Sequence, residues 1–130
     1  MFNAPEFEIE SETGAKISSR ELRGKTIVLH FWATSCGPCM GQMPEYIKSL
    51  SKLDQSQAEI LFVNLDDDQE KFLEAVNKFQ MPFTNLRDER GWGGDLARAF
   101  GVRSMPFDVI IDPDGKIVSN QIEDLKHLRK

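Results

Sequence analysis

The sequence predicts an α/β fold in which helices flank a central mixed sheet, with residues 1–130 forming a single domain. Two apolar runs, at residues 27–32 and 59–65, are separated by a stretch with helical periodicity. A strand, a helix and a second strand in this order form a right-handed unit with parallel strands. Residues 107–118 carry the pattern of an antiparallel hairpin, so both strand directions are expected. With 130 residues, 40% of them apolar, the chain can build one core.

The N-terminal part of the chain is expected to form a short edge strand and one helical turn. Residues 4–10 alternate apolar and charged side chains, which is typical of a strand with one solvated face. Within residues 18–24 a serine can cap a single helical turn that Gly24 ends. The run at 27–32 lacks strict alternation, which predicts a central strand buried on both faces, with His30 as its polar exception.

Two helices are expected around the second apolar run. Apolar residues recur at steps of three and four over 40–53, which predicts an amphipathic helix that Pro44 kinks without ending. Residues 59–65 form the next strand, and three aspartates follow at 66–68. Acids are favoured at a helix start, so we interpret them as the beginning of a helix over 72–79 rather than as a cation site.

The remaining segments complete the sheet and its covering helices. Residues 81–86 predict a short strand, the glycine-rich segment 91–94 a loop, and residues 96–100 a short helix closed by Gly101. Strands then flank a turn at residues 112–115.

A terminal helix is expected to start at Asn120, with Glu123 completing a capping box. Its buried stripe is formed by Ile122, Leu125 and Leu128. No internal repeat or linker divides the chain.

Charge and hydropathy limit the partners. The net charge of −5 and the pI near 5.0 argue against a nucleic-acid surface, because phosphate binding needs clustered Lys and Arg. No apolar run approaches the roughly 20 residues that span a bilayer, and the first residues do not form a secretory signal. Proteins or small molecules are therefore the expected partners, with no nucleic acid and no membrane for the chain as given. A leader or anchor removed beforehand would leave the same sequence.

The chemistry is expected at Cys36 and Cys39, the only two cysteines. A close C-x-x-C pair indicates redox or metal chemistry rather than a structural disulfide framework. The pair follows the central strand and opens a helix, whose free N–H groups and partial positive charge stabilise a thiolate. We therefore predict Cys36 as the nucleophile. A zinc site would want four ligands, and only His30 and His127 are available besides the cysteines, so no metal is expected.

The order of elements and the segment Phe31-Trp32-Ala33-Thr34-Ser35-Cys36-Gly37-Pro38-Cys39 resemble the thioredoxin family. The resemblance extends to Pro44 in the active-site helix and to Pro106, which falls where thioredoxins keep a cis-proline. The segments Ala4-Pro5-Glu6-Phe7 and Leu22-Arg23-Gly24-Lys25 are similar to the redoxin-type thiol-disulfide oxidoreductases, many of which serve cytochrome c maturation. That subfamily has an N-terminal extension and a central helix and strand insertion. The resemblance covers essentially the whole chain.

The resemblance implies a thiol-disulfide oxidoreductase that needs no cofactor. Cys36 attacks a substrate disulfide and Cys39 resolves the mixed disulfide. The Gly37-Pro38 pair resembles the reducing members of the family, which favours a reductant over an oxidase or isomerase. The residues that shape or contact the substrate site are Trp32, Gly37, Pro38, Met105 and Pro106.

The resemblance also implies the surroundings of the protein. Its partners would be disulfide-containing proteins and an upstream electron donor, and it would be a monomer. Its location would be extracytoplasmic, periplasmic with a possible anchor in a longer form, while a cytoplasmic location stays open.

Four positions depart from the family pattern. Ser35 stands where thioredoxins have a second Trp, and Met105 precedes Pro106 where Thr, Val or Ile is common. His30 occupies the position of the buried Asp of thioredoxin, and Gln42 that of a Glu in many redoxin-type relatives. Cys39 must lose a proton to act, and His30 is the candidate acceptor. The alternative is a hydrogen-bonded core histidine.

Two other functions remain open from the sequence. One is a thiol peroxidase, because redoxin-type chains share a superfamily with peroxiredoxins. Those place Thr three residues before the Cys with a Pro upstream, whereas Thr34 lies two residues before Cys36 and no Pro precedes it. The other is a redox-inactive binding module that has kept the fold.

Overall fold

A computed structural model describes residues 2–130. Its eight strands are β1 (Phe2–Asn3), β2 (Glu8–Ser11), β3 (Lys16–Ser18), β4 (Thr26–Trp32), β5 (Ala58–Asn64), β6 (Thr84–Arg87), β7 (Phe107–Ile111) and β8 (Lys116–Ser119). Its α-helices are α1 (Gly37–Leu50), α2 (Gln69–Phe79) and α3 (Asp95–Ala99), and its 3₁₀ helices are η1 (Ser19–Leu22) and η2 (Ile122–Leu128).

All eight strands belong to one mixed sheet with the order β1-β8-β7-β4-β5-β6-β2-β3. The central strand β4 runs parallel to β5 and antiparallel to β7, and β5 runs parallel to β6. Every residue of β4 is buried, as expected for a strand covered on both faces. The predicted mixed sheet with a parallel crossover and a terminal hairpin is confirmed.

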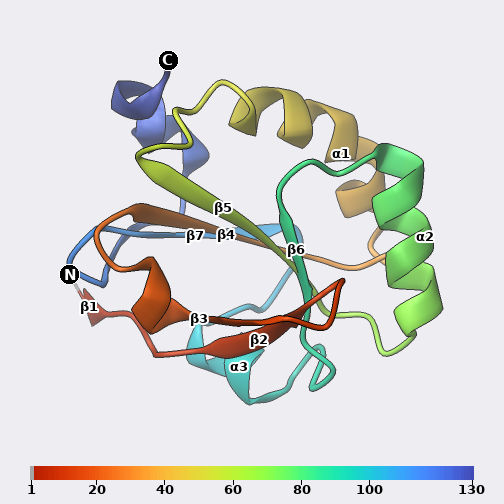
Figure 1. Cartoon of the computed structure of the whole chain (residues 1–130). Helices are drawn as coiled ribbons and strands as arrows, with labels where there is room; N and C mark the ends of the chain where they lie inside the picture. Colours follow the sequence, from red (N-terminus) through yellow and green to blue (C-terminus); the bar gives the residue numbers. More distant parts are fainter. Residues whose placement is uncertain (1) are drawn as a thin grey trace.

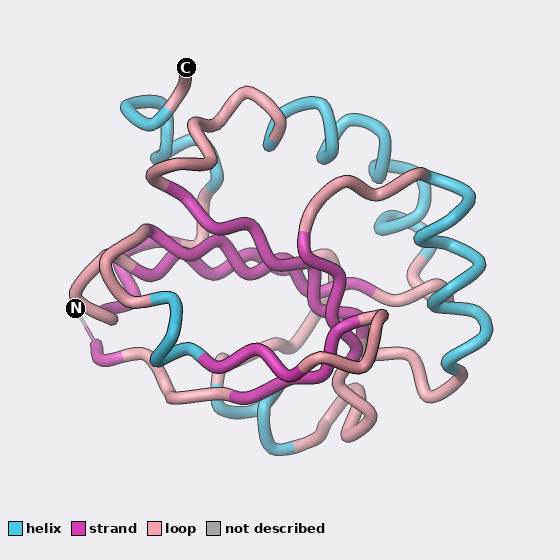
Figure 2. The backbone as a smooth tube through the Cα atoms, in the orientation of Figure 1, coloured by secondary structure: helices cyan, strands magenta, loops and turns pink. Residues whose placement is uncertain are grey.

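Helices cover the two faces of the sheet in separate groups. One buried apolar cluster joins β4 and β5 to α1, α2 and η2, and the other joins the opposite face to α3 and β2. Figure 1 shows α1 on one side of the central strands and α3 on the other, with β2 and β3 passing on the side of α3. The strands lie in the middle of the molecule and the helices outside them (Figure 2). Among the described residues, no helix has the length and apolar character to cross a membrane.

The helix boundaries follow local chemistry. α1 continues through Pro44 to Leu50, so the proline does not end it. Asp68 is the N-cap of α2, and its carboxylate accepts hydrogen bonds from the backbone N–H groups of Glu70 and Lys71. The 66–68 aspartates therefore include the expected helix start.

Two expectations for the ends of the chain are wrong. The strand predicted at 4–10 is not at the sheet edge, because β2 pairs with both β3 and β6.

The strands β1 and β3 were not predicted, because two or three residues are too few to show a periodicity.

The terminal helix also differs, because it is a 3₁₀ helix with Gln121 rather than Asn120 as its N-cap. Ser119 Oγ accepts a hydrogen bond from the backbone N–H of Gln121 and also binds the Asp124 carboxylate, which delays the helix start. The apolar residues at 122, 125 and 128 are spaced by three, which fits 3.0 residues per turn as well as an α-helix.

Candidate active site

The two cysteines lie where the chain passes from the central strand to α1. Trp32 ends β4, a short loop follows, and Cys36 and Cys39 form a disulfide whose Cα atoms are 5.2 Å apart. Strand and helix are both packed into the core, so the pair is held on rigid elements rather than on a long loop.

Cys36 occupies the N-cap position of α1. The backbone N–H of Cys39 points at its sulfur, with a distance of 3.1 Å between Cys39 N and Cys36 Sγ. In the reduced protein this N–H group and the positive end of the helix would both stabilise a thiolate at Cys36. Pro38 at the start of the helix costs no hydrogen bond, because the first N–H groups of a helix have no partner within it.

The two sulfurs differ in access. Cys36 is half-buried beside the exposed Gly37 and Pro38, whereas Cys39 has no exposed surface. An external disulfide can therefore reach only Cys36. This geometry suits the predicted order, in which Cys36 attacks and Cys39 resolves.

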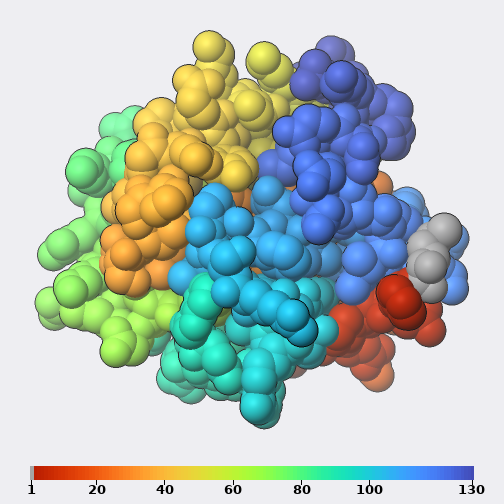
Figure 3. Space-filling model, turned by 180° about the vertical axis from the view of Figure 1, so that it is seen from behind, coloured from red at the N-terminus to blue at the C-terminus, as the bar shows by residue number. Residues whose placement is uncertain are grey.

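Met105 and Pro106 come from the other side of the site, just before β7. The peptide bond between them is cis, and the backbone oxygen of Met105 lies 3.5 Å from Cys36 Sγ. A disulfide sulfur has no hydrogen to donate, so this contact becomes a hydrogen bond only when Cys36 is a thiol. The surfaces around residues 35–42 and around residue 105 lie side by side on the face in Figure 3.

Trp32 and Ser35 have opposite environments. Trp32 is fully buried, with its ring centroid 6.3 Å from that of Phe72, and its indole nitrogen has no hydrogen-bond partner within residues 2–130. Any contribution of Trp32 to substrate binding must therefore act through the shape of the site. Ser35 is exposed immediately before the nucleophile.

His30 lies fully buried on β4, whereas Gln42 is exposed on α1. The His30 imidazole contacts Asp108 of β7, with 2.7 Å between Nδ1 and Oδ1. His30 replaces the buried Asp of the family pattern, yet a carboxylate lies beside it. Asp108 was missed because its partner lies 78 residues away in the sequence.

A second carboxylate missed by the sequence analysis holds the loop before Cys36. Asp66 accepts hydrogen bonds from the backbone N–H of Thr34 (3.0 Å to Oδ2) and from its hydroxyl (3.0 Å to Oδ1). The Asn64 side-chain amide also donates to Asp66, at 2.8 Å. The signal was available, because Asp66 follows a parallel strand whose carboxyl end meets the same sheet edge as the cysteine loop.

A groove runs beside the disulfide between α1 and α2, with a volume of about 430 Å³. It is lined by Thr34, Ser35, Met40, Asp66, Asp67, Lys71, Glu74, Ala75 and Lys78. Both charge signs occur along it, so a peptide segment of mixed charge is compatible with this surface.

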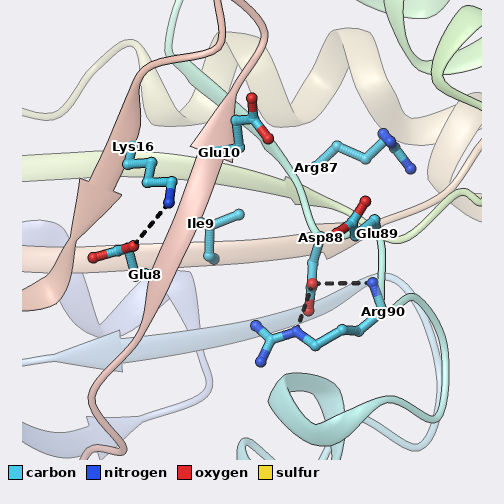
Figure 4. A pocket seen from close by; sticks show the side chains of 8 residues that line it. All are labelled: Glu8, Ile9, Glu10, Lys16, Arg87, Asp88, Glu89 and Arg90. Carbon is cyan, nitrogen blue, oxygen red and sulfur yellow. Dashed lines mark hydrogen bonds and ion pairs between the residues drawn. The ribbon is translucent and has the colours of Figure 1, made fainter.

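Another pocket, of about 200 Å³, lies away from the cysteines between the β2–β3 hairpin and residues 87–90 (Figure 4). Two ion pairs lie in it, because Asp88 accepts a hydrogen bond from Arg90 Nε at 2.8 Å and Lys16 lies 3.7 Å from Glu8. Asp88 Oδ2 has no hydrogen-bond partner within residues 2–130. Within residues 2–130, no group of three or more His, Cys, Asp or Glu side chains is arranged to hold a metal ion. The disulfide site is therefore the better candidate for chemistry.

Comparison with known proteins agrees with this arrangement. Residues 2–120 match the AhpC/TSA family. The chain belongs to this family. It is 30% identical over 115 residues to the thiol-disulfide oxidoreductase ResA of Bacillus thuringiensis, covering 88% of this chain and 65% of that protein. ResA of Halalkalibacterium halodurans is 31% identical over 115 residues, with 64% of its length covered. The chain thus spans less than two thirds of the length of these relatives.

Solved structures show the same fold. The thioredoxin domain of a thiol-disulfide oxidoreductase from Bacteroides vulgatus has a TM-score of 0.83 at 21% identity, covering 96% of this chain and 91% of that one. The thiol:disulfide interchange protein DsbE from Chlorobium tepidum has a TM-score of 0.78 at 27% identity, covering 98% and 90%. The predicted thioredoxin fold is confirmed, and so is the predicted resemblance to redoxin-type proteins, through the AhpC/TSA family.

Proposed function

We propose that the protein is a thiol-disulfide oxidoreductase that reduces disulfides of protein substrates. The observation that carries the proposal is the pairing of a half-exposed Cys36, at a helix N-cap, with a fully buried Cys39. The names of the ResA and DsbE relatives support the same reaction class.

The reaction needs only the two thiols of the reduced protein. The Cys36 thiolate attacks one substrate sulfur, forms a mixed disulfide and releases the other substrate sulfur as a thiolate. The Cys39 thiolate then attacks Cys36 Sγ, and the bond to the substrate breaks with its electron pair on the substrate sulfur. The substrate gains two electrons, and the protein returns to the disulfide form. An upstream dithiol donor must reduce it again.

The substrate would contact the groups around Cys36. Gly37 and Pro38 are exposed, and Met105 and Pro106 are half-buried on the opposite side of the sulfur. These four residues offer backbone and apolar surface to an extended segment next to a disulfide. This surface from two segments beside Cys36 is the reason for proposing a protein substrate rather than a small disulfide.

The surroundings are inferred from the resemblance to redoxin-type proteins. We infer one domain, a monomer, an extracytoplasmic location and a role in disulfide reduction linked to cytochrome c maturation. Cell fractionation of the full-length protein tests the location, and sedimentation tests the monomer.

A reductase assay tests the reaction. Wild-type protein with a dithiol donor should reduce a disulfide-bonded protein substrate, Cys36→Ser should be inactive, and Cys39→Ser should accumulate a mixed disulfide. Ser49→Ala, an exposed position on the same helix, should behave as wild type. Full activity in Cys36→Ser would refute the proposal.

The same preparations test the two alternatives. Consumption of hydrogen peroxide without reduction of disulfides would replace the proposal with the thiol peroxidase. Absence of both activities, with no partner trapped by Cys39→Ser, would favour the redox-inactive binding module.

A further inference from the structure

A buried pair of ionisable side chains lies behind the redox site. His30 of β4 and Asp108 of β7 are directly opposed across the antiparallel strand pair, so their side chains share one face of the sheet. The distance from His30 Nδ1 to Asp108 Oδ1 is 2.7 Å. His30 has no exposed surface, while the Asp108 side chain keeps 11% of its own.

The two nitrogens of His30 have different surroundings. A carboxylate only accepts hydrogen bonds, so Nδ1 must carry the hydrogen in this contact. Nε2 has no hydrogen-bond partner within residues 2–130. In the neutral imidazole Nε2 is therefore a free acceptor, whereas in the imidazolium it would be an unpaired buried donor, which costs about 1–3 kcal/mol.

We propose that Asp108 is a positioning residue for the thiol chemistry, which fixes His30 as the Nδ1–H tautomer and keeps Nε2 as the base for the resolving step. The proposal rests on the proposed function, because it assigns a role in that reaction.

His30 lies under the helix that carries the buried cysteine. The neighbouring alternate residues of β4, Val28 and Trp32, belong to the same buried cluster as Cys39. The His30 ring is 4.3 Å from that of Tyr46, measured between centroids. Tyr46 follows Cys39 by seven residues, or about two helical turns, so both lie on the same side of α1. The His30 imidazole and the Cys39 side chain are thus both buried between β4 and α1.

The proton balance of the resolving step follows. The S–H bond of Cys39 breaks and its proton is taken up at His30 Nε2. The new thiolate forms the bond to Cys36 Sγ, and the electron pair of the broken mixed disulfide leaves on the substrate sulfur. The imidazolium keeps its Nδ1–H bond to Asp108, whose negative charge compensates the new positive charge.

The Tyr46 ring that lies against His30 also lines a surface pocket. A pocket of about 260 Å³ between α1 and η2 is lined by Gln42, Glu45, Tyr46, Ser49, Ile122 and Glu123. Burial first, and then the charges of Asp108 and Glu123, raise the pKa of Tyr46 above its ordinary value. The titratable groups next to His30 within residues 2–130 are therefore Asp108 and Tyr46 of α1, whereas Glu123 of η2 acts on Tyr46. Within the described part of the chain, Asp108 is the one of these groups that forms a hydrogen bond to His30.

The wild-type protein provides a first test. Nitrogen chemical shifts and couplings of the His30 ring, in reduced protein at neutral pH, should show hydrogen on Nδ1 and none on Nε2. An Nε2–H tautomer would overturn the proposal without any substitution, and this result does not depend on activity.

A kinetic test separates the two steps. Reduced protein is mixed with an aryl disulfide that releases one coloured thiolate on attack by Cys36 and a second on resolution by Cys39. Asp108→Asn should leave the first phase unchanged and slow the second about tenfold near pH 7. A general base contributes roughly 10²–10⁴-fold, and loss of its positioning residue removes part of this. The difference between the two proteins should shrink as the pH rises, since hydroxide then takes over the role of the base.

Asp114→Asn is the matched control, because it removes one exposed carboxylate from the β7–β8 turn. It should leave both phases as in wild type. An unchanged second phase in Asp108→Asn, or a loss equal at all pH values, would overturn the role of Asp108. Absence of the first phase in wild type would instead refute the proposed function, and the tautomer would still be measured.

Discussion

Replacing Asp66 with alanine should destabilise the loop that carries the nucleophile. Asp66 is only 7% exposed, and its carboxylate accepts hydrogen bonds from three donor groups. These are the Thr34 backbone N–H, which reaches both oxygens, the Thr34 hydroxyl and the Asn64 side-chain amide. The backbone N–H of Asp66 donates to Asn64 Oδ1 at 2.9 Å, so strand end and loop are tied in both directions. The substitution leaves the donors without an acceptor.

The magnitude follows from those donors. Each buried donor without a partner costs about 1–3 kcal/mol. Thr34 is partly exposed, so water can replace part of its loss, whereas the Asn64 amide is fully buried. We expect Asp66→Ala to lower the free energy of unfolding by about 3 kcal/mol. Asp66→Asn should lower the free energy of unfolding by roughly 2 kcal/mol, because its side-chain NH₂ group would face other hydrogen-bond donors and only its oxygen could still accept.

Urea unfolding of the oxidised protein, followed by far-ultraviolet circular dichroism, measures the change. With a slope of about 1–3 kcal/mol/M, a loss of that size moves the midpoint by about 1–3 M. Asp67→Ala is the control, since its side chain is exposed and its effect should stay within about 0.5 kcal/mol. If the free energies of unfolding of Asp66→Ala and Asp67→Ala differ by less than about 1 kcal/mol, the hydrogen bonds to Asp66 do not hold the loop.

Three further predictions concern other parts of the chain. Asp68→Ala should cost about 1 kcal/mol in urea unfolding, because it removes the N-cap of α2. Tyr46 is the only tyrosine, so ultraviolet absorbance should show its titration above pH 10. Because folding raises the pKa of Tyr46, the free energy of unfolding should fall as the pH rises from 10 towards the raised pKa, and Tyr46→Phe should remove this fall. The hydrogen bond from Arg20 lowers the pKa of Glu6. The stabilisation by the ionised Glu6 should therefore be present above the ordinary Glu pKa and be lost as the pH falls through the lowered pKa. Glu6→Gln should lack this acid-dependent loss of stability, and added salt should make it smaller in wild type.

The central part of the fold could be predicted from local sequence patterns. The strand at 27–32, the helix after Cys36 and the hairpin each carry a signal within ten or so residues, and each is present in the structure. The peripheral elements could not be predicted in the same way. β1 and β3 form because the longer strands β8 and β2 offer them a free edge for pairing. The start of η2 depends on the Ser119 hydroxyl, which accepts a hydrogen bond from the backbone N–H of Gln121.

The site shows the same division. Cys36 and Cys39 were predicted because their spacing and their place at a helix start have chemical meaning in the sequence itself. Asp66 and Asp108 were missed, because a carboxylate gains its role from the side chain it faces after folding. Their partners lie 32 and 78 residues away, so no window of the sequence contains either pair.

Two carboxylates from the neighbouring strands lie at the site, although His30 and Gln42 stand where the family pattern has acids on β4 and α1. β4 is the central strand, and its neighbours β5 and β7 each end or begin at the edge where the cysteines lie. Asp66, just after β5, fixes the loop before the nucleophile, and Asp108, on β7, lies opposite His30. A histidine alone on β4 would be a buried polar group with no partner, which is costly. The histidine is tolerable there because the strand pairing places Asp108 against Nδ1, while Nε2 has no hydrogen-bond partner within residues 2–130.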